Sequence, residues 1–231
     1  PTNTCATSSS SFIVGENRGR NPRKETMNNM SSPSNNIQPS RATEHRGSDG
    51  SVIRMFDHKE AMRVILAWAD HDWPMTKQQA FELRDSLGWR LGPEGKGFVS
   101  TVQVGSERDG SILFDDRTGY FSSIRIPLTT KIPSELEKEF ADKLDDLYSA
   151  CVKSMQSKFG RGKDDSDDTI LHHSWYLPSK AYVSIGRFID KTVYDSTDIR
   201  YTVSVTIESP AMKDITDAEN AYFEYFGPDA P

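Results

Sequence analysis

The chain has 231 residues and a formal net charge of −6 at pH 7, and 35% of its residues are hydrophobic. Seven Lys and Arg residues and four acidic residues lie at or before Arg54, which leaves 21 basic and 30 acidic residues in the rest of the chain. Such an acidic body disfavours nucleic acid as a partner, because phosphate binding depends on clustered positive charge. No run approaches the roughly 20 apolar residues of a membrane-spanning helix, so the sequence predicts no membrane partner.

The first 50 residues differ in composition from the rest of the chain. They are rich in Ser, Asn, Arg and Pro, and a segment of this kind buries too little apolar surface to offset the entropy lost on ordering. We therefore predict a disordered polar tail over 1–50 and a single domain over 52–231. Only Cys5 and Cys151 occur, and no apolar signal segment is evident, which indicates a reducing, cytoplasmic location.

The first predicted helix begins at Asp57, an acidic N-cap that Glu60 follows three residues later. It ends at about Asp70 or Asp72, because Pro74 disfavours a helical conformation in the residue before it. Its apolar residues span a wide arc, so we expect the helix to be covered on more than one side or to form part of an interface.

The second predicted helix begins after Thr76, an N-cap whose capping box Gln79 completes. Gly88 ends this helix, and the alternation over 89–91 is typical of a strand. Three of the four tryptophans lie around this corner: Trp68, Trp73 and Trp89. They predict a corner that folds onto a shared core, and an aromatic platform for a ligand is the functional alternative.

Two sets of short strands flank a long third helix. The first set is predicted at 98–104, 111–114 and 120–126. The second set is predicted at 170–177, 181–188 and 199–207. The third helix begins at Ser134, where Glu137 completes a capping box, and it ends at Gly160. A short last helix over 214–226 presents Ala218, Tyr222, Tyr225 and Phe226.

The elements therefore follow the order α-α-β-β-β-α-β-β-β-α. Short strands between Gly and Asp turns are typical of antiparallel meanders. The sequence predicts an α+β fold, with an antiparallel sheet of about five to six strands and helices packed on one face.

His172 and His173 are neighbours in a predicted strand, so their side chains face opposite ways. His173 has the same parity as Trp175 and is expected to face inward. A core histidine is the simpler interpretation, yet burial tunes a histidine near neutral pH, so His173 is the first candidate if the protein is a catalyst. The candidate binding residues are Trp68, Trp73, Trp89, His173 and Trp175.

Two other candidate motifs do not have the residue spacing that their chemistry requires. The acidic run at 164–168 lacks the Gly and Glu positions of a calcium loop. The Gly-rich segment 92–97 lacks the spacing of a phosphate loop. Cys151 lies on an apolar helix stripe and is expected to be inert. The sequence therefore predicts no catalytic residues, no metal and no cofactor, and favours a binding protein over an enzyme.

One motif lies at the tryptophan corner: Trp73-Pro74-x-Thr76, Leu83 and Leu87-Gly88-Trp89. It resembles the W-P-x-T…L-G-W module of an actinobacterial family of unknown function, family 6301, although this chain has Met75 where the family is expected to have an aromatic residue. Similar small acidic proteins accompany secreted toxins or secretion systems, so the resemblance implies an immunity or chaperone role by association. The order of elements is also similar to that of secretion chaperones, which are acidic and usually dimeric.

Three functions follow from these observations. The first is a non-catalytic protein-binding module, most specifically an immunity-type protein whose acidic body occludes a basic toxin encoded beside it. The second is a secretion chaperone of the type III or type VII kind, a homodimer joined through the helix at 58–69. The third is a small-molecule enzyme with a site near His173 and the tryptophan corner.

Overall fold

The structure is a computed structural model that describes residues 42–95, 97–105, 107–167, 170–191 and 199–226, all within one compact unit, Gln38–Pro231. Its helices are α1 (His58–Ala69), α2 (Lys77–Ser86), α3 (Glu137–Phe159) and α4 (Pro210–Phe226), with short 3-10 turns at Pro93–Gly95 and Ser134–Leu136. Its strands are β1 (Ala42–Arg46), β2 (Val52–Phe56), β3 (Arg90–Leu91), β4 (Gly97–Val99), β5 (Gly110–Phe114), β6 (Phe121–Pro127), β7 (Ile132–Pro133), β8 (Lys163–Asp164), β9 (Leu171–Tyr176), β10 (Tyr182–Lys191) and β11 (Ile199–Glu208). None of the described helices is long and apolar enough to cross a bilayer.

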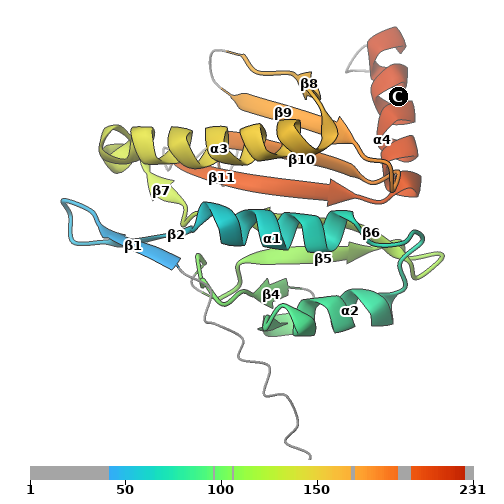
Figure 1. The fold of residues 1–231 in the computed structure, drawn as a ribbon, viewed down its shortest axis with the longest axis horizontal. Coiled ribbons are helices and arrows are strands. Elements are labelled where there is room, and N and C mark those ends of the chain that lie inside the picture. The colour runs from blue at the N-terminus through green and yellow to red at the C-terminus, as the bar shows by residue number, and fades with distance from the viewer. Residues whose placement is uncertain (1–41, 96, 106, 168–169, 192–198, 227–231) are drawn as a thin grey trace, which may run out of the picture. The chain divides into compact units, whose positions relative to one another are not determined.

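The main sheet has nine strands, and its neighbours pair antiparallel, so the fold is α+β (Figure 1). The strand order is β3-β4-β5-β6-β11-β10-β9-β8, and β7 also pairs with β11. The expected count of five to six strands is too low, because β3, β7 and β8 have two residues each and such short strands give no periodic pattern. Strand β11, the last in the chain, lies in the middle of the sheet.

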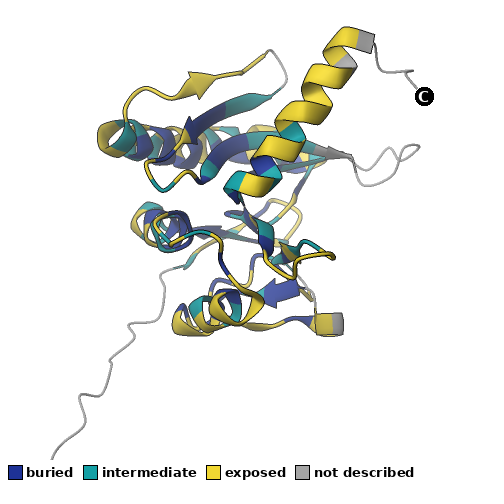
Figure 2. Cartoon of the chain, turned by 90° about the vertical axis from the view of Figure 1, so that its right-hand side faces the viewer, coloured by how far each residue is buried: buried dark blue, intermediate teal, exposed yellow. Residues whose placement is uncertain are grey.

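Helices α1 and α3 cover one face of this sheet (Figures 1 and 2). Strand β11 presents Val203, Val205 and Ile207 to them, and all three are fully buried. Helix α2 packs on the same side through Phe81, whose ring lies 5.6 Å from that of Phe114. These three residues alternate along β11 and share one face, because successive side chains of a strand face opposite ways.

Helix α4 departs from this layer. It follows β11 directly, with Ser209 as N-cap and Pro210 as its first residue, since the Ser209 hydroxyl accepts a hydrogen bond from the backbone N–H of Met212 at 3.2 Å. Its second turn contacts Tyr176 and Tyr182, which face away from α1 and α3. The prediction that the helices share one face therefore holds for α1, α2 and α3 only.

The hairpin of β1 and β2 lies partly in the segment predicted to be disordered. Ala42 to Arg46 pair with β2 in regular register, and β2 continues to the main sheet because Phe56 N donates to Leu128 O at 2.8 Å. The structure thus differs from the predicted tail over these residues, while 1–41 lie outside the described residues. Ala42 is the one apolar residue of β1 and packs against the core, and the His45 ring lies 6.2 Å from that of Phe140, so the strand has little apolar signal.

The helix ends show which caps form. Thr76 and Gln79 make the predicted capping box, and Gly88 adopts a φ of 73° after α2. Asp57 caps α1, but Glu60 pairs with Arg63 instead of completing the box. The predicted cap at Ser134 is wrong, because Ser134 opens a 3-10 turn and its hydroxyl makes no cap hydrogen bond.

Candidate functional site

Two of the candidate tryptophans belong to the core. Trp68 and Trp89 are 0% and 3% exposed. The Trp89 ring stacks on Phe98 at 4.4 Å, and Trp68 stacks on Phe121 at 5.7 Å. Their indole N–H groups are buried without hydrogen-bond partners. These two residues stabilise the corner by apolar burial, and no ligand from solvent reaches them.

Trp73 is different, because it is half-buried at the edge of this aromatic chain. Its ring lies 5.4 Å from that of Phe121, and a cis peptide bond joins it to Pro74. The corner is held against β6, since the Phe121 backbone N–H donates to Met75 O at 2.8 Å and Thr76 forms a bridge with Tyr120.

A hollow of about 390 Å³ opens beside Trp73. Its apolar wall includes Tyr120, Met212 and Ile215, so it joins the tryptophan corner to the first turns of α4. Asp115 lies on its rim, where hydrogen bonds from Thr118 lower the pKa of this carboxyl group. The hollow is thus apolar inside and charged at its rim, as is usual for binding pockets.

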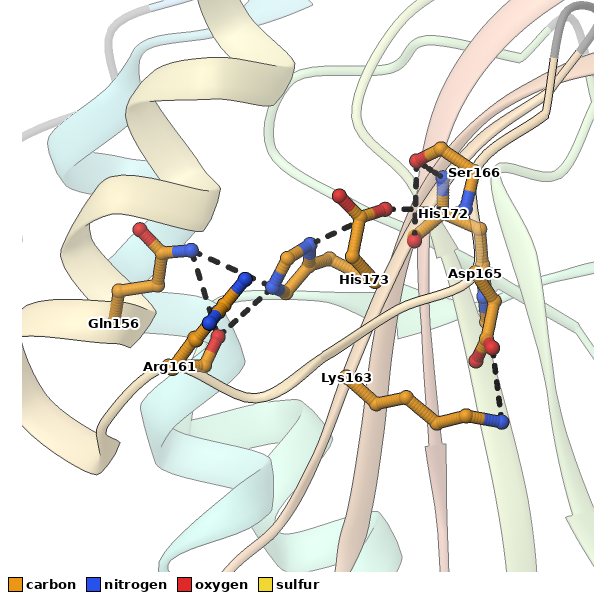
Figure 3. A network of polar contacts seen from close by, with 8 residues as sticks. Gln156, Arg161, Lys163, Asp165, Ser166, His172 and His173 are labelled. Atoms are coloured by element: carbon orange, nitrogen blue, oxygen red, sulfur yellow. Dashed lines mark hydrogen bonds and ion pairs between the residues drawn. The ribbon is translucent and has the colours of Figure 1, made fainter.

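His173 and Trp175 lie elsewhere, on β9. Figure 3 shows that His173 faces Gln156 and Arg161. His173 is buried, and its Nε2–H donates to the carbonyl oxygen of Arg161 at 2.8 Å. Its Nδ1 lies 3.8 Å from the carboxylate of Asp164. Trp175 Nε1 donates to the Gly160 carbonyl at 3.0 Å. Both side chains therefore fasten the 160–164 segment to β9.

In this arrangement both ring nitrogens of His173 face groups of the protein. A general base needs a ring nitrogen that faces substrate, whereas Nε2 of His173 donates to a backbone carbonyl and Nδ1 faces the Asp164 carboxylate. The adjacent Asp164 is fixed by Ser166, whose hydrogen bonds lower the pKa of the Asp164 carboxyl group. The ring contacts of His173 involve Trp175 at 5.0 Å, so these two residues form a cluster separate from the chain of aromatic rings at the tryptophan corner.

The described residues hold no group of three or more His, Cys, Asp or Glu side chains that could bind a metal ion. Cys151 is fully buried in α3, and burial raises the pKa of its thiol to about 12. A thiol with so high a pKa is a poor nucleophile near neutral pH.

The base of α4 is anchored on the outer face of the sheet by a polar and aromatic cluster. The ammonium group of Lys213 lies 4.4 Å from the ring centre of Tyr182 and pairs with Asp217. The hydroxyl of Tyr176 donates to Asp217 at 2.6 Å. Beyond this cluster the described side chains of α4 are exposed (Figure 2).

The exposed part of α4 carries an apolar stripe. Ala211, Ile215, Ala218, Tyr222 and Tyr225 recur at steps of four and three, which places them on one face of a helix. Met212, Lys213 and Thr216 occupy the opposite face, which packs on the body. Helical spacing predicts Ala218, Tyr222 and Tyr225 of this stripe. The position of the stripe beside Trp73 depends on tertiary contacts, which the sequence pattern does not show.

No curated protein and no solved structure matches the chain. A family model matches residues 59–194, which is more than half of the sequence and includes the tryptophan corner and α3. The matched residues cover nearly all of α1, the whole of α2 and α3, the corner and strands β3 to β10, and the chain is a member of the family of unknown function DUF6301.

Proposed function

We propose that this protein is a non-catalytic binding module that captures a basic protein partner through α4 and the hollow beside it. The apolar stripe of α4 carries the proposal, because Ile215 and Tyr225 are 47% and 79% exposed. We define the docking surface by six residues: Trp73, Tyr120, Ile215, Ala218, Tyr222 and Tyr225.

The chemistry of the docking surface favours a protein partner. Large contiguous apolar surfaces on soluble proteins mark interaction sites, and Trp and Tyr are enriched among residues that dominate binding energy. One face of α4 is anchored on the sheet, so the helix can present its other face to a groove without unfolding. The hollow beside Trp73 would receive an apolar side chain of the partner.

The charges around the docking surface favour a basic partner. Asp214 and Glu219 flank the apolar stripe on its two sides, and Glu224 lies near its end. None of these three carboxylates has an ion-pair or hydrogen-bond partner among the described residues. The whole chain has a net charge of −6. Complementary charge speeds association and sets orientation more than it adds affinity.

In its specific form the proposal is an immunity-type protein, with a co-encoded toxin as the basic partner. Helix α4 lies beyond the residues that the family model matches, 59–194. A docking surface outside the shared architecture suits a protein that must recognise one particular partner, because specificity depends on differences between surfaces.

The alternative functions have less support. A chaperone dimer through α1 needs apolar residues of α1 at the surface, but Ala61, Val64 and Ile65 are buried within this chain. An enzyme near His173 needs a ring nitrogen that faces substrate, whereas His173 fastens the turn after α3.

The test is affinity capture from the source cells with the full tagged chain as bait, followed by quantitative mass spectrometry. We expect a stoichiometric basic protein whose capture falls when salt is raised, because screening weakens charge complementarity. The double variant Ile215→Ser/Tyr225→Ser should reduce that capture at least tenfold, since both residues belong to the apolar stripe.

The matched control is Leu91→Ser, which removes a large side chain that is 50% exposed on β3, outside the docking surface. This variant should capture the partner as the unmodified chain does. Equal capture by the α4 double variant, with circular dichroism unchanged, would refute the docking surface. A partner that binds equally at low and high salt would refute its basic character.

A further inference from the structure

A second hollow lies on the face of the sheet that turns away from α1 and α3. The pairing of β5, β6 and β11 brings Ser111 opposite Arg125, and Ser204 opposite Pro127. Together with Arg108, Lys131 and Thr202 these residues line a hollow of about 290 Å³. The site shares no residue with the docking surface on α4, so the inference is independent of the proposed function.

Ser204 lies at the base of this hollow. The residue is 1% exposed, and its hydroxyl has no hydrogen-bond partner. Buried polar groups are nearly always hydrogen-bonded, so an unpartnered hydroxyl at the floor of a hollow calls for an explanation. The neighbouring Thr202 hydroxyl is already engaged with Thr129. The Ser204 hydroxyl is therefore an unsatisfied hydrogen-bonding group in the lining of the hollow.

Two arginines stand over the same hollow. Neither Arg108 nor Arg125 has an ion-pair or hydrogen-bond partner among the described residues. The guanidinium of Arg125 lies 5.7 Å from the ring centre of Phe188. That ring folds back over Gly186, where an added Cβ would lie 2.3 Å from it. Because Gly186 has no side chain, the Phe188 ring can lie against it and contact the guanidinium group of Arg125. Arg125 is thus positioned by an aromatic ring and has no carboxylate partner among the described residues.

The acidic residue in this wall does not neutralise the arginines. Asp109 is buried, and its carboxylate accepts hydrogen bonds from the backbone N–H groups of Ser100 and Gly105, both at 2.7 Å. These bonds close the loop that carries Arg108. The Asp109 carboxylate therefore bonds to the backbone of this loop and forms no ion pair with either arginine.

A neighbouring hollow of about 400 Å³ extends the site. The two hollows share Arg108, Asp109, Pro127 and Lys131, and the second also reaches Glu107 and Arg200. Guanidinium groups match the oxygens of phosphate with paired hydrogen bonds, and lysine adds a point charge. The small volumes of the two hollows suit a small molecule.

We propose that this site binds a phosphate-bearing small molecule, with Arg108 and Arg125 on the phosphate oxygens and the Ser204 hydroxyl as a further donor. The phosphate lies in the smaller hollow, and the rest of the molecule extends along Lys131. A single orthophosphate ion shares the same chemistry, so the experiment has to separate the two sources.

The test is isothermal titration calorimetry of the full chain with inorganic phosphate, pyrophosphate and ribose 5-phosphate. We expect saturable 1:1 binding of at least one of them, and at least tenfold weaker binding by Arg108→Gln/Arg125→Gln. Ribose 5-phosphate binding tenfold tighter than phosphate assigns an organic phosphate, and equal affinity assigns the ion itself. Arg117→Gln is the control, because Arg117 lines the hollow at Trp73 instead.

Ser204→Ala separates a ligand role from a structural one. Because the hydroxyl has no partner in the protein, its removal should weaken phosphate binding several-fold and leave the unfolding midpoint in urea unchanged or higher. Absence of saturable binding for all three probes would overturn the proposal, as would equal affinity in the double variant. Binding of a single-stranded oligonucleotide without binding of the small anions would also overturn it.

Discussion

The turn that follows α3 contains two glycines that differ in how much space surrounds an added side chain. Gly160 and Gly162 have φ values of 86° and 69°, which residues with a Cβ rarely adopt. A Cβ at Gly160 would meet no atom within 4 Å, whereas one at Gly162 would lie 2.5 Å from Nε1 of Trp175. The indole packs against this glycine to reach the Gly160 carbonyl.

We therefore expect Gly162→Ala to lower the free energy of unfolding by about 3 kcal/mol. Roughly 1 to 2 kcal/mol comes from the left-handed backbone, and the rest comes from overpacking against Trp175. Gly95→Ala is the matched control, since its φ is 73° with nothing within 4 Å; its loss should be limited to the backbone part. Urea unfolding of both variants measures the difference, and equal losses would contradict the contact.

At the scale of elements, the sequence identifies two helix starts with the same pattern, yet only one forms a cap. Thr76 and Gln79 bond reciprocally at α2. Ser134 and Glu137 have the same spacing, but the chain enters α3 through a 3-10 turn, and Leu136 occupies the cap position. The 3-10 turn over Ser134–Leu136 thus takes the place of the predicted cap, and the local sequence pattern does not predict this turn.

Thr76→Ala should consequently destabilise the protein by about 1 kcal/mol, the usual loss for an N-cap. Ser134→Ala should change stability by less than about 0.5 kcal/mol, because its hydroxyl caps nothing. Thermal and urea denaturation of the two variants, made in parallel, test the pair. A large loss at Ser134 would show that it caps α3 in solution.

The same contrast explains how far the sequence predicts the fold and the candidate sites. Long periodic elements such as α3 and β11 were predictable, because burial imposes a period on many residues. Two-residue strands and β1 were not, since pairing with distant segments creates them. Of the docking surface, Trp73 and the α4 stripe carry local signals, whereas Arg108 meets Ser204 only through the sheet register.

For the molecule as a whole, the ionisable groups whose pKa values shift on folding determine how stability depends on pH. Burial lowers the pKa of His45 and His172 below the ordinary 6.5. Hydrogen bonds lower the pKa of Asp164 and Asp217 below 3.8. Burial raises the pKa of Glu208 above 4.5. A depressed pKa means that the unfolded chain binds the proton more readily.

The two histidines should therefore contribute their whole share of the unfolding free energy above pH 6.5. The unfolding free energy should decrease as pH drops through their folded pKa values. It should fall again below pH 3.8 as the two aspartates protonate. Glu208 has the opposite effect at higher pH, because its protonation as pH falls towards 4.5 stabilises the folded chain and offsets part of the first decline. Urea titrations at pH 7.5, 5.5 and 3.5 check the order. His172→Gln should flatten the first decline, and an unchanged slope would contradict the role of its burial.

The central place of β11 has a consequence for synthesis of the chain. Until β11 leaves the ribosome, β6 and β10 lack the strand that lies between them in the sheet. Each then carries an unpaired backbone edge, and such edges favour pairing with other chains. The sheet can close only when β11 arrives, and α4 follows it within two residues. The nascent protein is thus most open to misassembly until β11 has left the ribosome.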